Sequence, residues 1–378
     1  MNQKKIKKLV TTKFEDANCI VIKIGSALLV DKTTNFLRLE WLESIASDVN
    51  KLRLAGKKVV IVSSGSVALG RRILKLGRVN LSLEESQAAA AVGQILLAQY
   101  YQSCLERYKI VSAQILVTAE DSQNRRRYLN SRATLLKLLE MSVVPIVNEN
   151  DTVATDEIRF GDNDRLAAQV ASLCDANILL LLSDVDGLYT SDPNLDPEAK
   201  HVPVVEKITD DIEMMGSDKN SELSKGGMLT KLEAAKVSVA AGCNMVIASG
   251  RSNFPISSIS QGQKSTWVLS LDNPIDARKQ WILNTKPKGQ IFIDLGAEEA
   301  ILNGKSLLPP GVIKISGQFL RGDTVSLITT DGKFFARGLI GYSYNDVELI
   351  KGCHSSKIKI ILGHPGRSVL IHRNDMTL

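Results

Sequence analysis

The run Val59-Val60-Ile61-Val62-Ser63-Ser64-Gly65-Ser66 predicts the fold of the larger part of this chain. A short, uninterrupted apolar run that breaks into Ser-Ser-Gly-Ser is typical of a parallel strand buried on both faces, and a helical pattern follows at 67–76. Ligands of open α/β sheets bind beyond the carboxyl ends of the strands, so Ser64 and Gly65 are candidates to meet a substrate carboxylate. Taken alone, serine capping of a helix beside a glycine turn explains them equally well.

Similar apolar runs alternate with helical patterns along the first 250 residues. Strands are expected at 19–24, 58–63, 111–117, 143–147, 177–182 and 244–248, and helices at 38–55, 66–76, 84–107, 122–141, 162–174 and 228–242. This alternation predicts the α/β class, a three-layer α/β/α sandwich around a mostly parallel sheet. The polar segments 149–160 and 184–225 are expected to form loops or a hairpin at the rim of a site.

The pattern changes to short β-like runs near residue 285. The clearest runs are 290–293, 312–315, 323–329, 334–340 and 368–372. We therefore expect one domain at 1–275, which includes a basic, solvated tail at 1–14, a transition at 252–284, and a small β-rich domain at 285–378. The last segment holds 12 Lys/Arg and 8 Asp/Glu, a net charge of +4, which is modest for a nucleic-acid binder.

Composition excludes several classes of protein. Hydrophobic residues make up 44% of the 378 residues, which is ordinary for a globular protein. No apolar run approaches the ~20 residues of a membrane span, and no signal-peptide core follows the basic start. The five cysteines are scattered without metal-ligand spacing, which favours a reduced, cytoplasmic chain. None of the four histidines lies beside a plausible nucleophile, so a Ser-His-Asp mechanism has little support.

Gly161-Asp162-Asn163-Asp164 places two carboxylates and an amide where a glycine turn opens a helix. A helix N-terminus offers unpaired backbone N–H groups and the positive end of a dipole, around which a ligand can be organised. An aspartate N-cap followed by a second acidic residue is the alternative interpretation.

Two lysines, Lys23 and Lys231, are candidates to bind an anion. Lys23 ends a β-branched run just before Gly25 and Ser26, so a strand would bring one ammonium to its carboxyl end. Burying that lysine in an apolar run requires an anionic partner, unless the strand lies at a sheet edge and the side chain reaches water. Lys231 follows the glycine pair at 226–227, one turn inside a predicted helix, which suggests a phosphate cradle. The Walker A and Rossmann glycine spacings are both absent.

Seven motifs in this order resemble the amino acid kinase family over roughly residues 15–270. They are Val-Ile-Lys-Ile-Gly-Ser from 21, Ser-Ser-Gly from 63, Asn-Arg-Arg-Arg-Tyr-Leu-Asn from 124, Val-Pro-Ile-Val-Asn-Glu-Asn-Asp from 144, Gly-Asp-Asn-Asp from 161, Leu-Leu-Ser-Asp-Val-Asp-Gly-Leu-Tyr from 181 and Gly-Gly-Met-Leu-Thr-Lys from 226. The segment from about 285 resembles a PUA domain. Within the family, this pairing of domains is specific to the branch that phosphorylates glutamate.

The resemblance implies transfer of a phosphoryl group from ATP, with Mg²⁺, to the γ-carboxylate of L-glutamate, the first step of proline synthesis. Both reactants are anions, and a carboxylate is already deprotonated at neutral pH, so charge-offsetting lysines matter more than a general base. By resemblance, Lys23 and Lys231 flank the transferred group and Asp164 holds both ammonium groups in register.

The resemblance also assigns the binding residues. Ser64, Asp151 and Asn163 would form the glutamate site, with Asp151 as the counter-charge to the substrate ammonium. The ATP-binding residues would be Lys23, Ser183, Asp184, Lys225, Gly226, Gly227, Met228, Leu229, Thr230 and Lys231. No metal ligand is assigned, and the roles of Asp162 and Lys225 stay open.

The sequence leaves two alternative functions open. One alternative is an RNA-binding or RNA-modifying protein that acts through the PUA-like domain, and another is a family kinase acting on aspartate, acetylglutamate, carbamate or a nucleoside monophosphate. The resemblance further implies a homo-oligomer, a dimer or tetramer, and glutamyl-phosphate reductase as a downstream partner.

Overall fold

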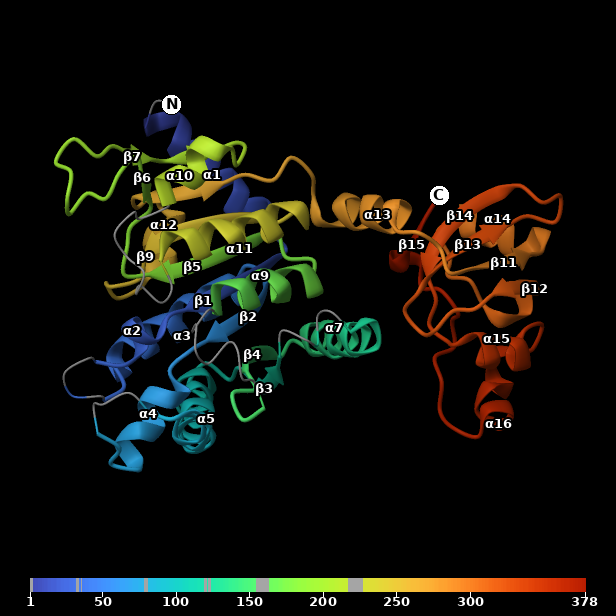
Figure 1. Ribbon diagram of the computed structural model, residues 1–378, viewed down its shortest axis with the longest axis horizontal. Coiled ribbons are helices and arrows are strands. Elements are labelled where there is room, and N and C mark those ends of the chain that lie inside the picture. Colours follow the sequence, from blue (N-terminus) through green and yellow to red (C-terminus); the bar gives the residue numbers. More distant parts are fainter. Residues whose placement is uncertain are drawn as a thin grey trace. The chain divides into compact units, whose positions relative to one another are not determined.

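The chain forms two compact units in the computed structural model, which describes residues 3–31, 34, 36–77, 81–118, 121, 124–153, 163–216 and 227–378 (Figure 1). The first unit comprises Met1–Ser122 and Ser131–Pro274, and the second comprises Gln123–Asn130 and Ile275–Leu378.

An eight-stranded sheet forms the centre of the first unit, in the order β3-β4-β2-β1-β5-β9-β10-β8. Its strands are β1 (Cys19–Ile24), β2 (Lys58–Ser63), β3 (Ser112–Val117), β4 (Val144–Glu149), β5 (Ile178–Ser183), β8 (Val204–Val205), β9 (Asn244–Ser249) and β10 (Ser265–Val268). All neighbouring strands are parallel except β9 and β10. The predicted α/β class with a mostly parallel sheet is confirmed.

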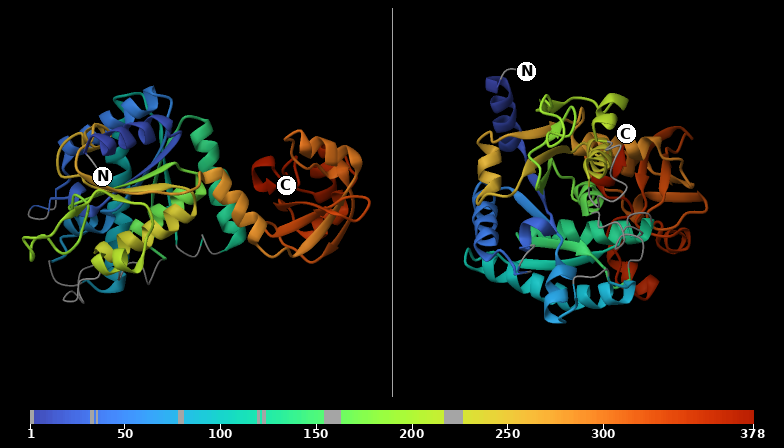
Figure 2. Two further views of the ribbon diagram at one scale, coloured as in Figure 1. Left: turned by 90° about the horizontal axis from the view of Figure 1, so that it is seen from above. Right: turned by 60° about the vertical axis from the view of Figure 1, so that its left-hand side comes forward.

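Helices cover both faces of this sheet (Figure 2). The helices of the first unit are α1 (Gln3–Asp16), α2 (Ser26–Leu29), α3 (Leu39–Leu54), α4 (Ser66–Ile73), α5 (Leu83–Glu106), the second half of α7 (Arg125–Glu140), α9 (Asn163–Leu173), α10 (Asp210–Gly216), α11 (Met228–Ala240) and α12 (Pro255–Ser260). Helices α9 and α11 pack together on one face, and α3 packs with α5 and α12 on the other.

The core beneath α3 shows how the strands alternate. Ile20, Ile22 and Ile24 of β1 are fully buried in the cluster that contains Trp41 of α3. Successive strand residues point to opposite faces, so Val21 and Lys23 face α9 and α11. The alternation therefore directs Lys23 toward the N-termini of these two helices.

The N-terminal segment corrects one prediction. Residues 3–16 form α1 and not a solvated tail, because Ile6, Val10 and Phe14 recur every four residues and make an apolar stripe. Val10 is 1% exposed and Phe14 is 5% exposed. The Phe14 ring packs edge-on against Trp267, with ring centroids 5.8 Å apart. Lys5, Lys7 and Lys8 are exposed on the other side of the helix.

The predicted transition at 252–284 is also corrected. Its first half contributes α12 and β10 to the first unit, and Trp267 of β10 is fully buried. The hairpin expected within 184–225 is present as β6 (Leu188–Tyr189) paired antiparallel with β7 (His201–Val202). Residues 154–160 and 217–226 of the predicted loops lie outside the described residues.

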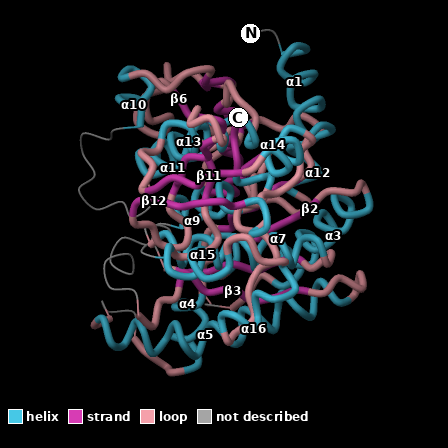
Figure 3. The backbone as a smooth tube through the Cα atoms, turned by 90° about the vertical axis from the view of Figure 1, so that its right-hand side faces the viewer, coloured by secondary structure: helices cyan, strands magenta, loops and turns pink. Residues whose placement is uncertain are grey.

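The second unit is built on a five-stranded sheet, in the order β12-β11-β13-β14-β15. Figure 3 draws the strands in magenta and labels β11 and β12 of this sheet. Its elements are α13 (Pro274–Asn284), β11 (Gly289–Ile293), α14 (Leu295–Leu302), β12 (Val312–Gly317), β13 (Thr324–Ile328), β14 (Phe334–Leu339), α15 (Tyr344–Ile350), α16 (Ile358–Leu362) and β15 (Met376–Thr377), with the first residues of α7. The strand predicted at 368–372 is wrong: it forms only an isolated bridge between Leu307 and Ile371, and β15 is the closing strand.

Candidate active site

The carboxyl ends of β1, β2, β4 and β5 lie at one edge of the sheet, because these strands are parallel neighbours. Gly25, Ser64, Asn150 and Asp184 are the residues that follow these four ends. Open α/β sheets bind their ligands at this edge. These four residues lie together although Gly25 and Asp184 are 159 positions apart in the sequence.

Three charged side chains meet on the α9 side of this edge. The Nζ atom of Lys23 lies 2.6 Å from Oδ1 of Asp164, and Nζ of Lys231 lies 3.1 Å from Oδ2 of the same carboxylate. The side chains are 12% exposed for Lys23, 7% for Lys231 and 2% for Asp164. The convergence expected from the resemblance is thus present in the structure.

Each side chain of this cluster lies on a strand or in the first turn of a helix. Lys23 lies on β1, which pairs with β2 on one side and β5 on the other. The alternative of an edge-strand lysine that reaches water is therefore wrong. Asp164 lies in the first turn of α9, and Lys231 lies in the first turn of α11. Because α9 and α11 pack together, their first turns bring the carboxylate and the second ammonium to the same place.

Electrostatics keep Asp164 ionised in this cluster. Burial by itself would raise the pKa of the Asp164 carboxyl, but the ammonium groups of Lys23 and Lys231 outweigh that cost and hold its pKa below the usual value. One carboxylate balances two ammonium groups, so these three groups carry one net positive charge. Such a buried cation attracts a phosphate or a carboxylate.

Asn163 connects the ends of β2 and β4 in the site. Its Nδ2 donates to the Ser63 carbonyl oxygen at 2.9 Å and to the Ser64 hydroxyl oxygen at 2.8 Å. It also lies 3.2 Å from Oδ1 of Asn148 in β4. The side chain of Ser64 is thereby oriented next to the Lys23–Asp164–Lys231 cluster, and the predicted pair Ser64 and Asn163 is brought into contact.

Asp151 lies in the turn after β4 and is held by helix α4. Its Oδ2 accepts a hydrogen bond from the Ser66 hydroxyl at 2.9 Å. Burial raises the pKa of the Asp151 carboxyl, and the Ser66 hydrogen bond offsets part of that rise. No ammonium group of the described residues pairs with this partly buried carboxylate, which therefore suits a cationic group of a ligand.

The sequence did not point to the side chains that support this arrangement. The Asn148 amide donates to Oε1 of Gln94 at 2.7 Å and lies 3.5 Å from the Ser66 hydroxyl. All three are polar side chains buried in the protein. An asparagine inside the apolar run of β4 was the available signal, whereas Gln94 lies in an alanine-rich helix and gives none.

The predicted nucleotide segments begin at the adjoining strand end. The Ser183 hydroxyl donates to the exposed Asp184 carboxylate at 3.2 Å, directly after β5. Gly227 caps α11, and its carbonyl accepts a hydrogen bond from the Thr230 hydroxyl at 2.9 Å. The side chains of Met228 and Leu229 are partly or largely exposed at this helix end.

Four residues of the predicted site lie outside the described residues: Gly161, Asp162, Lys225 and Gly226. Within the described part of the chain, no group of three or more His, Cys, Asp or Glu side chains is arranged to hold a metal ion. Of the helices that the structure describes, none has the length and apolar character to cross a membrane.

The sheet, its site and the sequence together define the class of protein. The model of the amino acid kinase family matches residues 18–249, and that of the PUA domain matches residues 289–362. The chain belongs to the amino acid kinase family and carries a C-terminal PUA domain.

Several relatives of nearly the same length are named glutamate 5-kinase. The chain is 54% identical over 362 residues to a protein named glutamate 5-kinase from Dinoroseobacter shibae, covering 96% of this chain and 98% of the relative. A glutamate 5-kinase from Paracoccus denitrificans is 55% identical, covering 98% of this chain and 99% of the relative. One from Rhodopseudomonas palustris is 52% identical with the same two coverages.

Proposed function

We propose that this protein transfers the γ-phosphoryl group of ATP to the γ-carboxylate of L-glutamate, giving L-glutamate 5-phosphate and ADP. The buried Lys23–Asp164–Lys231 cluster at the sheet edge is the observation that carries the proposal. Membership of the family and full-length similarity to glutamate 5-kinases support the choice of substrate.

The cluster addresses the main obstacle of this reaction, which is repulsion between two anions. An oxygen of the γ-carboxylate attacks the γ-phosphorus, and the bond from phosphorus to the β–γ bridging oxygen breaks. No proton has to be removed, since the carboxylate is ionised at neutral pH. Lys23 and Lys231 offset the charge on the transferred group. Asp164 fixes the positions of both ammonium groups before the substrates bind.

The glutamate site is formed by Ser64, Asn163 and Asp151 in this proposal. Ser64 and Asn163 belong to one hydrogen-bonded group beside the catalytic cluster, where they can meet a carboxylate. Asp151 supplies the counter-charge for the α-ammonium group. Its hydrogen bond from Ser66 fixes the direction of the carboxylate.

The ATP site is formed by Lys23, Ser183 and Asp184 together with the segment 225–231. The first turn of α11 presents backbone N–H groups to the phosphates, and Lys231 of that turn joins the cluster with Lys23. Mg²⁺ enters as the complex with ATP and neutralises part of the phosphate charge. Asp184, exposed after β5, contacts the nucleoside.

An acceptor screen tests the proposed function. The acyl phosphate product reacts with hydroxylamine to a hydroxamate, so the purified full chain is incubated with MgATP, hydroxylamine and one acceptor at a time. Glutamate should give hydroxamate, whereas aspartate and acetylglutamate should give little, and ADP release should not be stimulated by carbamate or nucleoside monophosphates. A higher kcat/KM for any of these other acceptors would refute glutamate as the substrate.

Replacing Asp151 with asparagine should raise the KM for glutamate about 10- to 100-fold, because a charged hydrogen-bond partner of the α-ammonium is lost. The KM for ATP should change little. Asparagine keeps an acceptor for the Ser66 hydroxyl, so the turn should be preserved. Steady-state kinetics with each substrate varied in turn provide the measurement. Asp272→Asn, at an exposed position of the same unit, is the control, and an unchanged glutamate KM in Asp151→Asn would move the ammonium site elsewhere.

The pH dependence of glutamate binding should report Asp151 directly. Because burial raises the pKa of this carboxyl, it becomes protonated on acidification before an ordinary aspartate of pKa ~3.9. The KM for glutamate should therefore rise as the pH falls through this raised pKa. Protonation of glutamate itself, with a γ-carboxyl pKa of ~4.3, also raises the KM on acidification and affects both proteins. Asp151→Asn should lose the contribution of Asp151 and retain that of glutamate; identical profiles for both proteins would contradict the assignment.

We assign residues 1–275 to the kinase domain and 285–378 to the PUA domain. The enzyme would act in the cytoplasm as a homo-oligomer in proline biosynthesis and pass its labile product to glutamyl-phosphate reductase. An RNA-modifying activity is not favoured, since the full-length relatives are kinases.

A further inference from the structure

A cavity of about 760 Å³ in the second unit is lined by four basic side chains. They are Arg126, Arg321, Arg367 and His364. All residues that line it belong to 123–130 or 275–378, so the cavity lies within this unit. Its volume is in the range of small-molecule sites, roughly 300–1,000 Å³. The proposed kinase activity does not use it.

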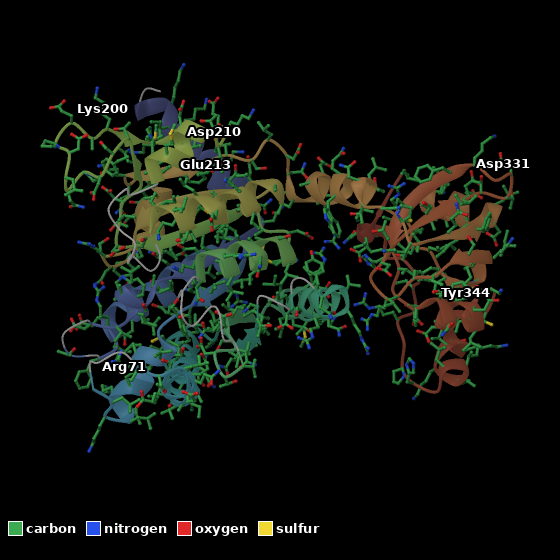
Figure 4. All side chains as sticks on the ribbon, viewed as in Figure 1. Arg71, Lys200, Asp210, Glu213, Asp331 and Tyr344 are labelled. Carbon is green, nitrogen blue, oxygen red and sulfur yellow. The ribbon has the colours of Figure 1, made fainter. Side chains whose placement is uncertain are left out.

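Hydrogen bonds within the unit hold the walls of this cavity. The Gly322 amide donates to the Ile340 carbonyl at 2.7 Å, which joins the two loops that carry Arg321 and Tyr342. The Tyr342 hydroxyl donates to the backbone carbonyl of Arg367 and fixes the third loop. Tyr344, labelled in Figure 4 at the start of α15, donates its amide to the Phe319 carbonyl at 2.9 Å. The cavity is therefore formed before any ligand binds.

The two acidic residues at the cavity are engaged by other groups. Oδ2 of Asp323 accepts the Leu320 amide at 2.8 Å and closes a turn. Oδ2 of Asp346 accepts the Ser343 hydroxyl at 2.7 Å and its amide at 3.2 Å, as the N-terminal cap of α15. Among the described residues, no carboxylate lies within ion-pair distance of Arg126, Arg321 or Arg367. The two carboxylates offset two of the three guanidinium charges, so with a neutral His364 the lining has a net charge of +1.

Arg321 shows that these guanidinium groups are close enough to affect one another. Burial lowers the pKa of Arg321, and the positive charges of Arg367 and Arg126 lower it further. Its Nε atom is buried and has no hydrogen-bond acceptor within the described part of the chain. A buried donor without an acceptor and a cluster of like charges are both unfavourable. A bound anion would relieve both costs.

We propose that this cavity is a binding site for a phosphate group, held by Arg321 and Arg367 with Arg126 and His364 at its edge. Arginine forks match the oxygens of a phosphate and form strong charge-assisted hydrogen bonds with it. A doubly charged phosphate also balances several guanidinium groups better than a single carboxylate does. The phosphate can be carried by a small molecule or by an RNA strand, and the two sources are separated below.

Calorimetric titration of the full chain with inorganic pyrophosphate tests this site. Arg321→Gln and, separately, Arg367→Gln should weaken binding about tenfold or more, as expected for losing a charged hydrogen-bond donor. Arg367→Gln leaves the backbone carbonyl that holds Tyr342 in place. Lys359→Gln, an exposed charge of the same unit outside the lining, should bind as the parent does.

Variants also separate this site from the kinase site. Lys231→Ala should retain the Arg321-dependent pyrophosphate binding, and Arg321→Gln should retain glutamate kinase activity. If Lys231→Ala abolishes the binding and both arginine variants retain it, the ligand occupies the kinase site and the proposal fails. Failure of the kinase assignment would not affect this result, because binding is measured without turnover.

A second arm identifies the source of the phosphate. A short single-stranded RNA is titrated at ~150 mM salt, where non-specific contacts are weak. Arg321-dependent binding of pyrophosphate but not RNA assigns a small-molecule site, and tighter Arg321-dependent binding of the RNA assigns a phosphodiester ligand. Absence of Arg321-dependent binding in both titrations would overturn the proposal.

Stability distinguishes a binding role from a structural one. Without ligand, Arg321→Gln should unfold at the same temperature as the parent or a higher one, because a partly buried charge that neighbouring arginines repel has been removed. Pyrophosphate should raise the Tm of the parent more than that of the variant. A lower Tm of the ligand-free variant together with equal pyrophosphate effects would show that Arg321 supports the fold and would refute the site.

Discussion

Lys231→Ala and Lys23→Ala should each fold normally and lose ~10²–10³ in kcat, as expected for removing one preorganised donor from the transition state. Both ammonium groups bind Asp164 in the structure, at 3.1 and 2.6 Å. Loss of either one leaves the carboxylate with one partner and the transferred phosphoryl group with half of its lysine charge. Steady-state kcat for glutamate phosphorylation and far-UV circular dichroism of each variant provide the measurements.

Lys236→Ala is the matched control for Lys231→Ala. Lys236 lies on the same helix and forms an ion pair with Glu213, labelled in Figure 4, at 2.7 Å. Both side chains of this ion pair are substantially exposed, so the pair should contribute little to stability. The kcat of Lys236→Ala should therefore stay near that of the parent. Near-parent turnover in Lys23→Ala or Lys231→Ala would refute their catalytic roles.

Asp164→Asn should lower both the free energy of unfolding and kcat. The substitution removes the carboxylate that binds both ammonium groups, and removing one partner of a buried ion pair costs about 3–5 kcal/mol. Urea denaturation measures the stability, and the kinase assay measures turnover. The double variant Asp164→Asn/Lys231→Met removes one of the two ammonium groups, so it should regain part of the stability without regaining activity. Parent-like stability of Asp164→Asn would contradict the electrostatic account of the cluster.

The same carboxylate has a defined effect on acid stability. The pKa of Asp164 is held below its usual value in the folded chain, so its contribution is present above the unfolded pKa of ~3.9 and is lost as the pH falls through the folded value. The raised pKa of Asp151 acts in the opposite sense, because protonation relieves the burial of its charge. Acid unfolding should therefore be less steep in Asp164→Asn than in the parent.

The central strands were predictable because their sequences determine them locally. The run at 19–24 is β-branched and buried on both faces, and β1 has these bounds in the structure. Strand alternation then fixes the face of Lys23. The meeting of Lys23, Asp164 and Lys231 followed from the resemblance, since no local pattern links residues that are so far apart in the sequence.

Two elements were missed because their apolar residues have distant partners. In α1 the lysines dominate the sequence. The stripe of Ile6, Val10 and Phe14 is buried against distant partners such as Trp267, which contacts Phe14 and lies some 250 residues later. Strand β10 has only four residues and lies among prolines and glycines, so the strand is too short for an alternating pattern to be recognised. Its place is set by antiparallel pairing with β9.

The polar group that supports the substrate residues could not be predicted either. The hydrogen bond from Asn148 to Gln94 joins β4 to α5. Whether a polar residue in an apolar run is buried and paired depends on the tertiary neighbours that satisfy it. The sequence therefore indicated candidates for ligand contact, but not the residues that hold those candidates in position.

A crystal structure of the full chain with ADP and glutamate bound would show where the two anions meet. We expect the γ-carboxylate of glutamate and the terminal phosphate of ADP to approach each other between the ammonium groups of Lys23 and Lys231, with Asp164 in contact with both lysines and the α-ammonium group at Asp151. Glutamate or ADP bound at another place in the kinase domain, with the three charged side chains away from both ligands, would contradict it.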